Sequence, residues 1–359
     1  ALNNMALYAE NKLSMAINTK QNVELTAGIR EDITSIPGSE YGTVGSLSPR
    51  LNMRYVLRFD QESWVNSLSL HSGWGKSVKL PSFQVLYPSP SYRDMLAFSS
   101  TSDANNRSYY AYYTYPSKAR YNADLKWQYA NQWDLGMELR TKIADINLSF
   151  FHSKTFNPYM ATNTYTPFTY KYTSPAKLQA SGIATANRLF TIDPQTGIVT
   201  VSDASGAKAP VVLGYDERNT YVTNTKYVNA DPLSRYGLEW IVDFKQIKAL
   251  RTQVRVDGKY YHYKAQDETL FADVPVGLNT RQSDGKLYQY IGYYRGGAAT
   301  STNYTANASA SNGSVSGQVD MNVTLTTHIP KIRLIVALRL ESSLYTYSRA
   351  TSIRGYVVN

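Results

Sequence analysis

The stretch WDLGMELR, residues 133–140, decides the fold of this chain because apolar and polar side chains alternate along it. In a β-strand, successive side chains point to opposite faces. One face therefore carries Trp133, Leu135, Met137 and Leu139, and the other carries Asp134, Gly136, Glu138 and Arg140. The charged face needs water or charged partners, because an unpaired buried charge is costly. The stretch thus predicts a strand between an apolar phase and a hydrated one.

This strand is half of a pair. Residues 125–142 and 145–155 both alternate and are joined by a short turn. A connection of about fifty residues precedes the pair, and one of nearly eighty follows it. Structureless connections of that length are unusual inside a compact soluble domain. Short turns at one end and long loops at the other are typical of outer-membrane β-barrels.

Four further pairs repeat the arrangement, at residues 4–17 and 21–31, 48–59 and 63–77, 234–244 and 250–263, and 317–327 and 331–345. A membrane β-strand needs about 9–11 residues. The pattern therefore predicts an all-β fold, an antiparallel transmembrane β-barrel segment of about ten strands with long extracellular loops. A soluble β-sandwich also alternates, but the regular placement of the long connections favours the barrel. A low-complexity stretch is predicted at residues 298–316.

Composition excludes several other classes of protein. The chain has 359 residues, no cysteine and a formal net charge of +10. Its cations alternate with apolar residues along the predicted strands instead of clustering, which disfavours nucleic acid as a partner. No apolar run approaches the roughly 18 residues of a membrane helix. Four scattered histidines show no metal-ligand spacing, and no nucleophile is paired with a base. We therefore expect no enzyme, cofactor or metal, and a turn rather than a calcium site at residues 103–106.

Several motifs resemble those of one family. LSPRLN at residues 47–52 is similar to the LSPRLxL strand opening of TonB-dependent outer-membrane receptors. GWGKSVKLPSFQVLY at 73–87 is similar to their GxGxxFRAPSFxELY segment, and NADLK at 122–126 to their NPxLKPE segment, with Ala123 and Trp127 in place of its prolines. WDLGME at 133–138 and YGLE at 236–239 resemble two later strand openings, YELGLE and YGVE. The motifs stand in the family's order, and the long Tyr- and Asn-rich loops resemble Bacteroidetes receptors, including the SusC-like branch.

The resemblance implies a fold, a location and an activity. It implies a 22-stranded barrel in the bacterial outer membrane, of which these strands would be about the eleventh to the twentieth. Residues 1–359 would then be one partial receptor barrel, with the plug domain, the TonB box and the last strands absent from this sequence. The implied function is TonB-energised uptake of a scarce nutrient of the glycan, peptide, siderophore or cobalamin class. The implied partners are outer-membrane lipid, the receptor's own N-terminal plug domain, the TonB complex and a surface lipoprotein.

Three alternatives to the transporter are compatible with the same barrel wall. A passive outer-membrane pore or a surface adhesin would lack the plug and the TonB box. A complete ten-stranded barrel would need its first and last strands to pair with each other.

Two sets of residues are candidate sites. The first is the aromatic run Tyr109, Tyr110, Tyr112, Tyr113 and Tyr115, within a predicted loop. Tyrosine offers a broad apolar face and a hydroxyl group, so these rings could contact a ligand. Packing within the loop is an equally good interpretation of this run. For Tyr260, Tyr345 and Tyr347, near strand ends, an aromatic girdle at the membrane interface is the better interpretation.

The second set lies on the charged faces of the predicted strands: Arg54, Glu138, Arg140, Glu239, Arg251, Arg255, Arg339 and Glu341. A barrel this wide would be an open pore without a plug. We therefore predict that these residues face the lumen and hold the plug through ion pairs. The alternative is that they only line a hydrated lumen.

Overall fold

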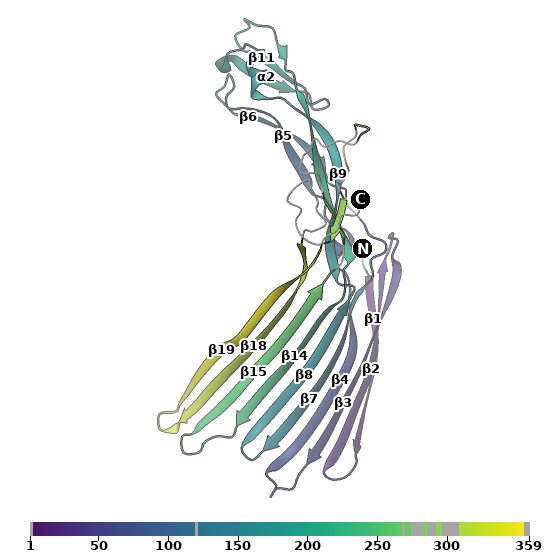
Figure 1. The fold of residues 1–359 in the computed structure, drawn as a ribbon, viewed down its shortest axis with the longest axis vertical. Helices are drawn as coiled ribbons and strands as arrows, with labels where there is room; N and C mark the ends of the chain where they lie inside the picture. The colour runs from purple at the N-terminus through teal and green to yellow at the C-terminus, as the bar shows by residue number, and fades with distance from the viewer. Residues whose placement is uncertain are drawn as a thin grey trace.

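A computed structural model describes residues 3–118, 121–267, 270–273, 283–285, 292–295 and 309–354. It has two parts, a broad sheet of long strands and an arm that extends from one end of that sheet (Figure 1). Within the described residues, no helix combines the length and the apolar character needed to cross a membrane.

The broad sheet contains ten strands, and every neighbouring pair is antiparallel. In spatial order they are β1 (Asn3–Ala16), β2 (Gln21–Ile36), β3 (Gly42–Arg58), β4 (Val65–Lys79), β7 (Gln128–Thr141), β8 (Ala144–Phe156), β14 (Leu233–Phe244), β15 (Thr252–Gln266), β18 (Ser309–Ile329) and β19 (Leu334–Arg354). The predicted all-β fold and its ten strands are confirmed.

Two connections differ from the sequence-based prediction. The loop expected between the first two pairs is mostly strand, because β2 runs to Ile36 and β3 begins at Gly42, so short and long connections do not strictly alternate. The predicted low-complexity stretch spans residues 298–316, and its part up to residue 308 lies outside the described residues. Its remaining part, 309–316, forms the start of β18. In both places cross-strand pairing extends the strands beyond their locally alternating segments.

The arm is built from the long connections between strands of the broad sheet. It contains the hairpins β5 (Tyr92–Ser100) with β6 (Tyr109–Pro116) and β9 (Tyr159–Tyr172) with β13 (Asp216–Asn229). A small sheet of β10 (Arg188–Ile192), β11 (Val199–Asp203) and β12 (Val211–Val212) lies beside the short helix α2 (Pro175–Gln179). The remaining elements are α1 (Phe83–Leu86), two 3-10 turns at 185–187 and 330–332, and the paired strands β16 (Leu270–Asp273) and β17 (Gly292–Arg295).

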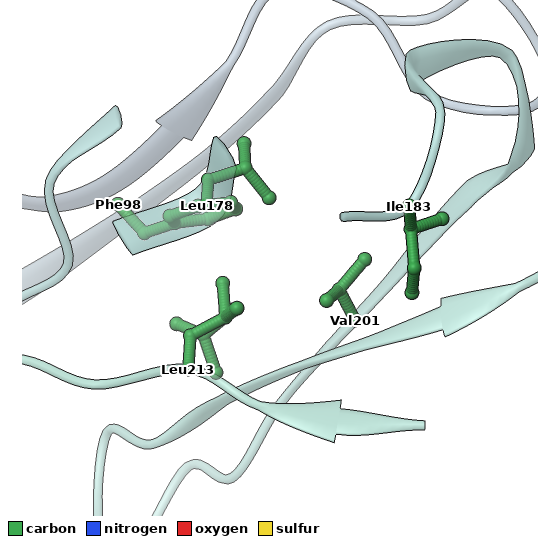
Figure 2. Packing of buried hydrophobic residues seen from close by; sticks show 6 residues of the cluster. Phe98, Leu178, Ile183, Val201 and Leu213 are labelled. Atoms are coloured by element: carbon green, nitrogen blue, oxygen red, sulfur yellow. The ribbon is translucent and has the colours of Figure 1, made fainter. Parts of the chain in front are cut away.

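The arm has its own hydrophobic core (Figure 2). Six buried residues form it: Phe98, Leu178, Ile183, Val199, Val201 and Leu213. They come from β5, α2, β11 and the segments that flank these elements, so two long connections of the broad sheet, β4–β7 and β8–β14, share one core. Residues 188–203 form a hairpin of β10 and β11, with Gly197 at φ 70° in its turn. Burying this apolar surface stabilises the arm as a folded unit.

A second core joins the arm to the broad sheet. Ile36, Leu86, Leu125 and Trp127 are buried there. Tyr159, at the start of β9, packs against them. Its hydroxyl group donates to the carbonyl of Lys79 at 2.8 Å and accepts the backbone N–H of Gln128 at 2.9 Å. One side chain of the arm therefore bridges the ends of two neighbouring strands, β4 and β7.

Replacing Tyr159 by phenylalanine is expected to weaken this junction by about 1–2 kcal/mol, because two backbone groups lose their partner. Burial raises the pKa of Tyr159 to about 12, although the Gln128 N–H acts in the opposite direction. A raised pKa means that the hydroxyl's stabilising contribution is intact below pH 10 and is lost as the pH rises through about 12. Limited proteolysis of the arm between pH 8 and 12 measures both effects. Equal cleavage of wild type and Y159F at every pH would contradict the bridge.

Candidate functional site: a pocket in the arm and a charged wall

The broad sheet has two chemically different faces, which follow from its register. Cα partners in an antiparallel pair lie on the same face. Leu51, Trp74 and Trp133 are successive partners, as are Met53, Ser72 and Leu135. We call this side of the sheet the apolar face. Its leucine, methionine and tryptophan side chains are exposed in the isolated chain, including Leu135 at 55% and Leu338 at 63%, so it needs an apolar environment such as lipid.

The opposite side is the charged face, and its cations and carboxylates pair across the strands. Arg54 on β3 reaches Glu138 on β7 at 3.0 Å. Arg255 on β15 lies 3.6 Å from both Asp243 and Asp257. Further pairs are Lys12–Glu24, Arg50–Glu10, Lys259–Asp320, Arg339–Glu341 and Arg339–Asp257. These pairs remain partly exposed, as expected for a hydrated surface rather than a dry core.

Seven of the eight residues that were predicted to face the lumen lie on strands of the broad sheet, at positions of the charged face. Glu239 accepts the hydroxyl of Tyr261 at 2.9 Å. Arg140 is the Cα partner of Ser67 and Asp145. Arg251 differs from the predicted alternation, because it precedes β15 and adopts a left-handed turn conformation with φ 50°. Its carbonyl accepts the His328 N–H at 3.0 Å, which places it in the turn region rather than in the wall.

The predicted aromatic run lies in strand β6 and not in an irregular loop. Tyr115 stacks on Phe168 of β9 with 4.6 Å between ring centroids, and Tyr113 does so at 5.7 Å. Tyr109 packs against Phe98 and Phe190 in the arm core. Tyr110 and Tyr112 are exposed, at 57% and 58%. Tyr109, Tyr113 and Tyr115 therefore pack against other aromatic rings of the arm, whereas the side chains of Tyr110 and Tyr112 are largely exposed to solvent.

A pocket of about 320 Å³ opens where three hairpins of the arm meet. Tyr112 and Tyr113 line it from β6, and Tyr170 and Lys171 from β9. The β10–β11 turn and Glu217 of β13 complete the wall. The pocket thus offers aromatic surfaces beside one cation and two carboxylates. This is the composition expected of a site that holds a ligand by apolar contact and orients it by a few polar groups.

The β10–β11 turn forms a rigid polar edge of this pocket. The Asp193 carboxylate accepts the Thr196 hydroxyl at 2.5 Å and the Gln195 N–H at 2.8 Å. These hydrogen bonds, with the Thr196 hydroxyl contributing most, hold the pKa of Asp193 below its usual value. Lys171 lies over the ring of Tyr215, 4.6 Å from its centroid. Asp193 is therefore ionised at neutral pH, and both charged groups have fixed positions.

Sequence reasoning missed most of the pocket. Tyr170, Lys171 and Glu217 meet there because β9 pairs with β13 in a register that makes Lys171 the Cα partner of Glu217. The two strands are separated by more than forty residues of sequence. Residues 103–106 form the predicted turn, in which Asp103 accepts the N–H groups of Asn105 and Arg107 at 2.8 and 2.9 Å. Across the part of the chain that the structure describes, no three His, Asp or Glu side chains are grouped to hold a metal ion.

A family model described as "TonB dependent receptor-like, beta-barrel" matches residues 2–261. No curated protein matches the chain. A solved structure with a similar arrangement is the siderophore receptor PirA from Acinetobacter baumannii, at 11% identity and a TM-score of 0.32. The match covers 97% of this chain and 47% of that one, so the chain spans about half of that receptor's length.

Proposed function

This chain belongs to the TonB-dependent receptor β-barrel family, and from that premise we propose that it forms half of the wall of an active nutrient transporter. The family consists of outer-membrane proteins that transport and do not catalyse reactions. The observation that carries the proposal is the division of the sheet into an apolar face and a charged face. A wall of this kind separates lipid from a hydrated lumen.

In this proposal the full receptor encloses an N-terminal plug domain within a 22-stranded barrel. The ligand binds on the extracellular side, and the TonB complex then pulls on the plug to open a path. Residues 1–359 supply wall, lumen surface and part of the ligand-binding surface. A surface lipoprotein that covers the pore would fit the same arrangement.

The arm supplies the ligand-binding surface in this proposal. It stands at the end of the sheet with the long connections (Figure 1), which is the extracellular end in outer-membrane barrels. Its pocket combines Tyr112 and Tyr170 with Lys171, Asp193 and Glu217. Such a lining suits a polar ligand with apolar surfaces, as glycans, peptides, siderophores and cobalamins have. Tyr112 and Tyr113 are the members of the aromatic run that we propose to contact it.

Uptake by intact cells tests the transporter against its alternatives. A radiolabelled ferric siderophore, cobalamin, oligosaccharide and short peptide are each offered to cells that express the full receptor. We expect uptake of one class, and we expect that uptake to stop when TonB is deleted or a protonophore is added. Uptake that persists without TonB would identify a passive pore, and surface binding without any uptake would identify an adhesin.

The wall residues Arg140 and Arg255 give a separate prediction. We propose that the charged face contacts the plug through these and neighbouring charges. Replacing both arginines with alanine in the full receptor is then expected to increase passive entry of small hydrophilic antibiotics several-fold, because the plug loses ionic contacts. The control replaces Lys248 and Lys331, exposed cations of the short turns, with alanine. Identical permeability of the two variants would mean that the arginines only line a hydrated lumen.

A further inference from the structure

The arm pocket contains a carboxylate that has no partner within the protein. Glu217 of β13 is exposed and lines the pocket. Its Cα partner on β9 is Lys171, and opposite charges at such positions ordinarily attract each other across the strands. Here the two side chains form no ion pair, and the Glu217 carboxylate has no hydrogen bond to any described residue. The preceding carboxylate, Asp216, does have a partner, because it forms an ion pair with Lys177.

Aromatic rings hold the two cations that are placed to neutralise Glu217. Lys171 lies over the ring of Tyr215, with its Nζ atom 4.6 Å from the centroid. Arg218, the next residue along β13, lies over the ring of Tyr172 at 3.5 Å. Because neighbouring residues of a strand point to opposite faces, Arg218 is also directed away from the Glu217 side. The carboxylate of Glu217 is therefore free for a cation that arrives with a ligand.

A second polar group of the pocket also lacks a partner. Tyr170 lines the pocket and is only 6% exposed, yet its hydroxyl has no hydrogen-bond partner in the part of the chain that the structure describes. A buried tyrosine hydroxyl ordinarily finds such a partner. Tyr113 lies beside Tyr170, with 6.2 Å between the ring centroids, and the exposed Tyr112 lines the same pocket. The pocket thus combines a free carboxylate, an unpaired hydroxyl and aromatic surfaces.

Charge and volume limit the group that fits this pocket. Its charged lining residues are Lys171, Asp193 and Glu217, so the pocket is locally negative although the whole chain has a net charge of +10. A negatively charged ligand group is therefore disfavoured, and the tyrosine rings attract cations to their faces. The volume of about 320 Å³ is at the lower end of the range for small-molecule sites. One side chain of a larger ligand fits that space better than a whole cobalamin or siderophore.

The pocket adjoins a strand edge that no other described strand occupies. Tyr112 and Tyr113 line the pocket from β6, and in the described part of the chain β6 pairs with β5 alone. The second edge of β6 therefore carries backbone N–H and C=O groups outside any ladder. An extended peptide binds such an edge through main-chain hydrogen bonds, and its side chains enter neighbouring pockets. A ligand that fills the pocket with one group and continues along β6 would be a peptide.

We propose that the arm pocket is a subsite for a cationic side chain, an arginine or a lysine, of a peptide ligand. The cationic head group binds the Glu217 carboxylate through charge-assisted hydrogen bonds. The rings of Tyr112 and Tyr113 cover the aliphatic stem of that side chain, and the Tyr170 hydroxyl accepts a further hydrogen bond. This inference rests on the proposed function, because it names the class of nutrient, but its test does not depend on transport.

Calorimetry with the full-length receptor in detergent tests this proposal. The probes are three pentapeptides with blocked ends and alanine at every position except the centre, which is arginine, citrulline or glutamate. Citrulline has nearly the shape of arginine but no charge, and the blocked ends remove the terminal charges. We expect the arginine peptide to bind about tenfold more tightly than the citrulline peptide, because its hydrogen bonds to the carboxylate are charge-assisted. The glutamate peptide is expected to bind most weakly of the three.

Three variants of the receptor assign the preference to Glu217. Glu217→Gln keeps the size of the side chain and removes its charge, so the preference for arginine over citrulline is expected to fall to about twofold or less. Glu217→Asp keeps the charge and should retain most of the preference. Glu40→Gln is the matched control, because Glu40 is an exposed carboxylate in the β2–β3 connection and does not line the pocket. It should bind all three peptides like wild type.

Several outcomes would overturn the proposal. They are equal affinity of wild type for the arginine and citrulline peptides, an undiminished preference in E217Q, and no binding of any of the three peptides. Binding of acetylarginine amide as tightly as the arginine peptide would replace the peptide by a small free cation. Uptake by cells reports on the transporter separately: a charge preference without TonB-dependent uptake would contradict the transporter and support the subsite, and TonB-dependent uptake without a charge preference would do the reverse.

Discussion

Replacing Gly258 with alanine is expected to destabilise the barrel wall by about 2–3 kcal/mol, because the new methyl group has no space. A Cβ atom at this position would lie 2.3 Å from the indole ring of Trp240 and 2.5 Å from the carbonyl oxygen of Asp320. Trp240 is the Cα partner of Gly258 on β14, and its ring covers the glycine. An aromatic side chain that covers a glycine on a neighbouring strand is a known device for fixing the register of a β-sheet.

The carbonyl of Asp320 makes this clash severe. The indole could turn away into lipid, but the carbonyl belongs to β18, whose Asp320 pairs with Lys259 beside the glycine. Moving it would disturb the pairing of β15 with β18. The same arrangement occurs three more times in the sheet, where His71, Phe151 and Tyr347 cover their partners Gly136, Gly237 and Gly317. Close ring contacts therefore depend on glycine at four places in the wall.

The measurement is refolding of the full receptor into detergent, followed by gel mobility with and without heating and by urea unfolding. Gly75→Ala is the matched control, because a Cβ there would meet its nearest atoms at 3.5 and 3.6 Å, which is ordinary contact. We expect G75A to fold like wild type and G258A to give much less folded protein. Equal urea midpoints for the two variants would show that the space around Gly258 is not limiting.

Replacing Tyr112 with alanine is expected to weaken ligand binding by about 30-fold, which corresponds to about 2 kcal/mol for an aromatic anchor at a binding site. Tyr112 lines the arm pocket and its side chain is 58% exposed, so it makes few contacts with the rest of the arm. Its removal should therefore affect binding and not folding. Tyr113 is less informative, because it also stacks on Phe168 and its loss would loosen the arm.

Tyr92 provides the matched control for this prediction. It lies on β5, the partner strand of β6, is 67% exposed and does not line the pocket. Binding of the class of compound that cells take up is measured by calorimetry with wild type, Y112A and Y92A in the full receptor. We expect Y92A to bind like wild type. An equal loss of affinity in Y112A and Y92A would indicate a general effect on the folding of the arm. Unchanged affinity in Y112A would show that the arm pocket is not part of the binding site.

The two faces of the barrel wall could be predicted from sequence, because the face of each side chain depends only on its position along its own strand. Alternation with a period of two assigns each side chain of a strand to a face without knowledge of any partner strand. Arg54, Glu138 and Arg255 were placed on the charged face in this way, and the structure puts them there. Arg251 shows the limit of the method, since alternation does not reveal where a strand gives way to a turn. The motifs at residues 47–52 and 73–87 resembled the family to which the chain belongs.

The arm and its pocket depend on contacts between residues far apart in the chain. Nothing within residues 157–232 states that Lys171 will be the Cα partner of Glu217, or that Tyr112 of an earlier segment will join them. The sequence by itself determined that this chain is a two-faced membrane wall, since a strand's side-chain period is a local property of the backbone. Tertiary structure alone decided which side chains meet on each face and in the arm, since register and packing are set by pairing across large sequence separations.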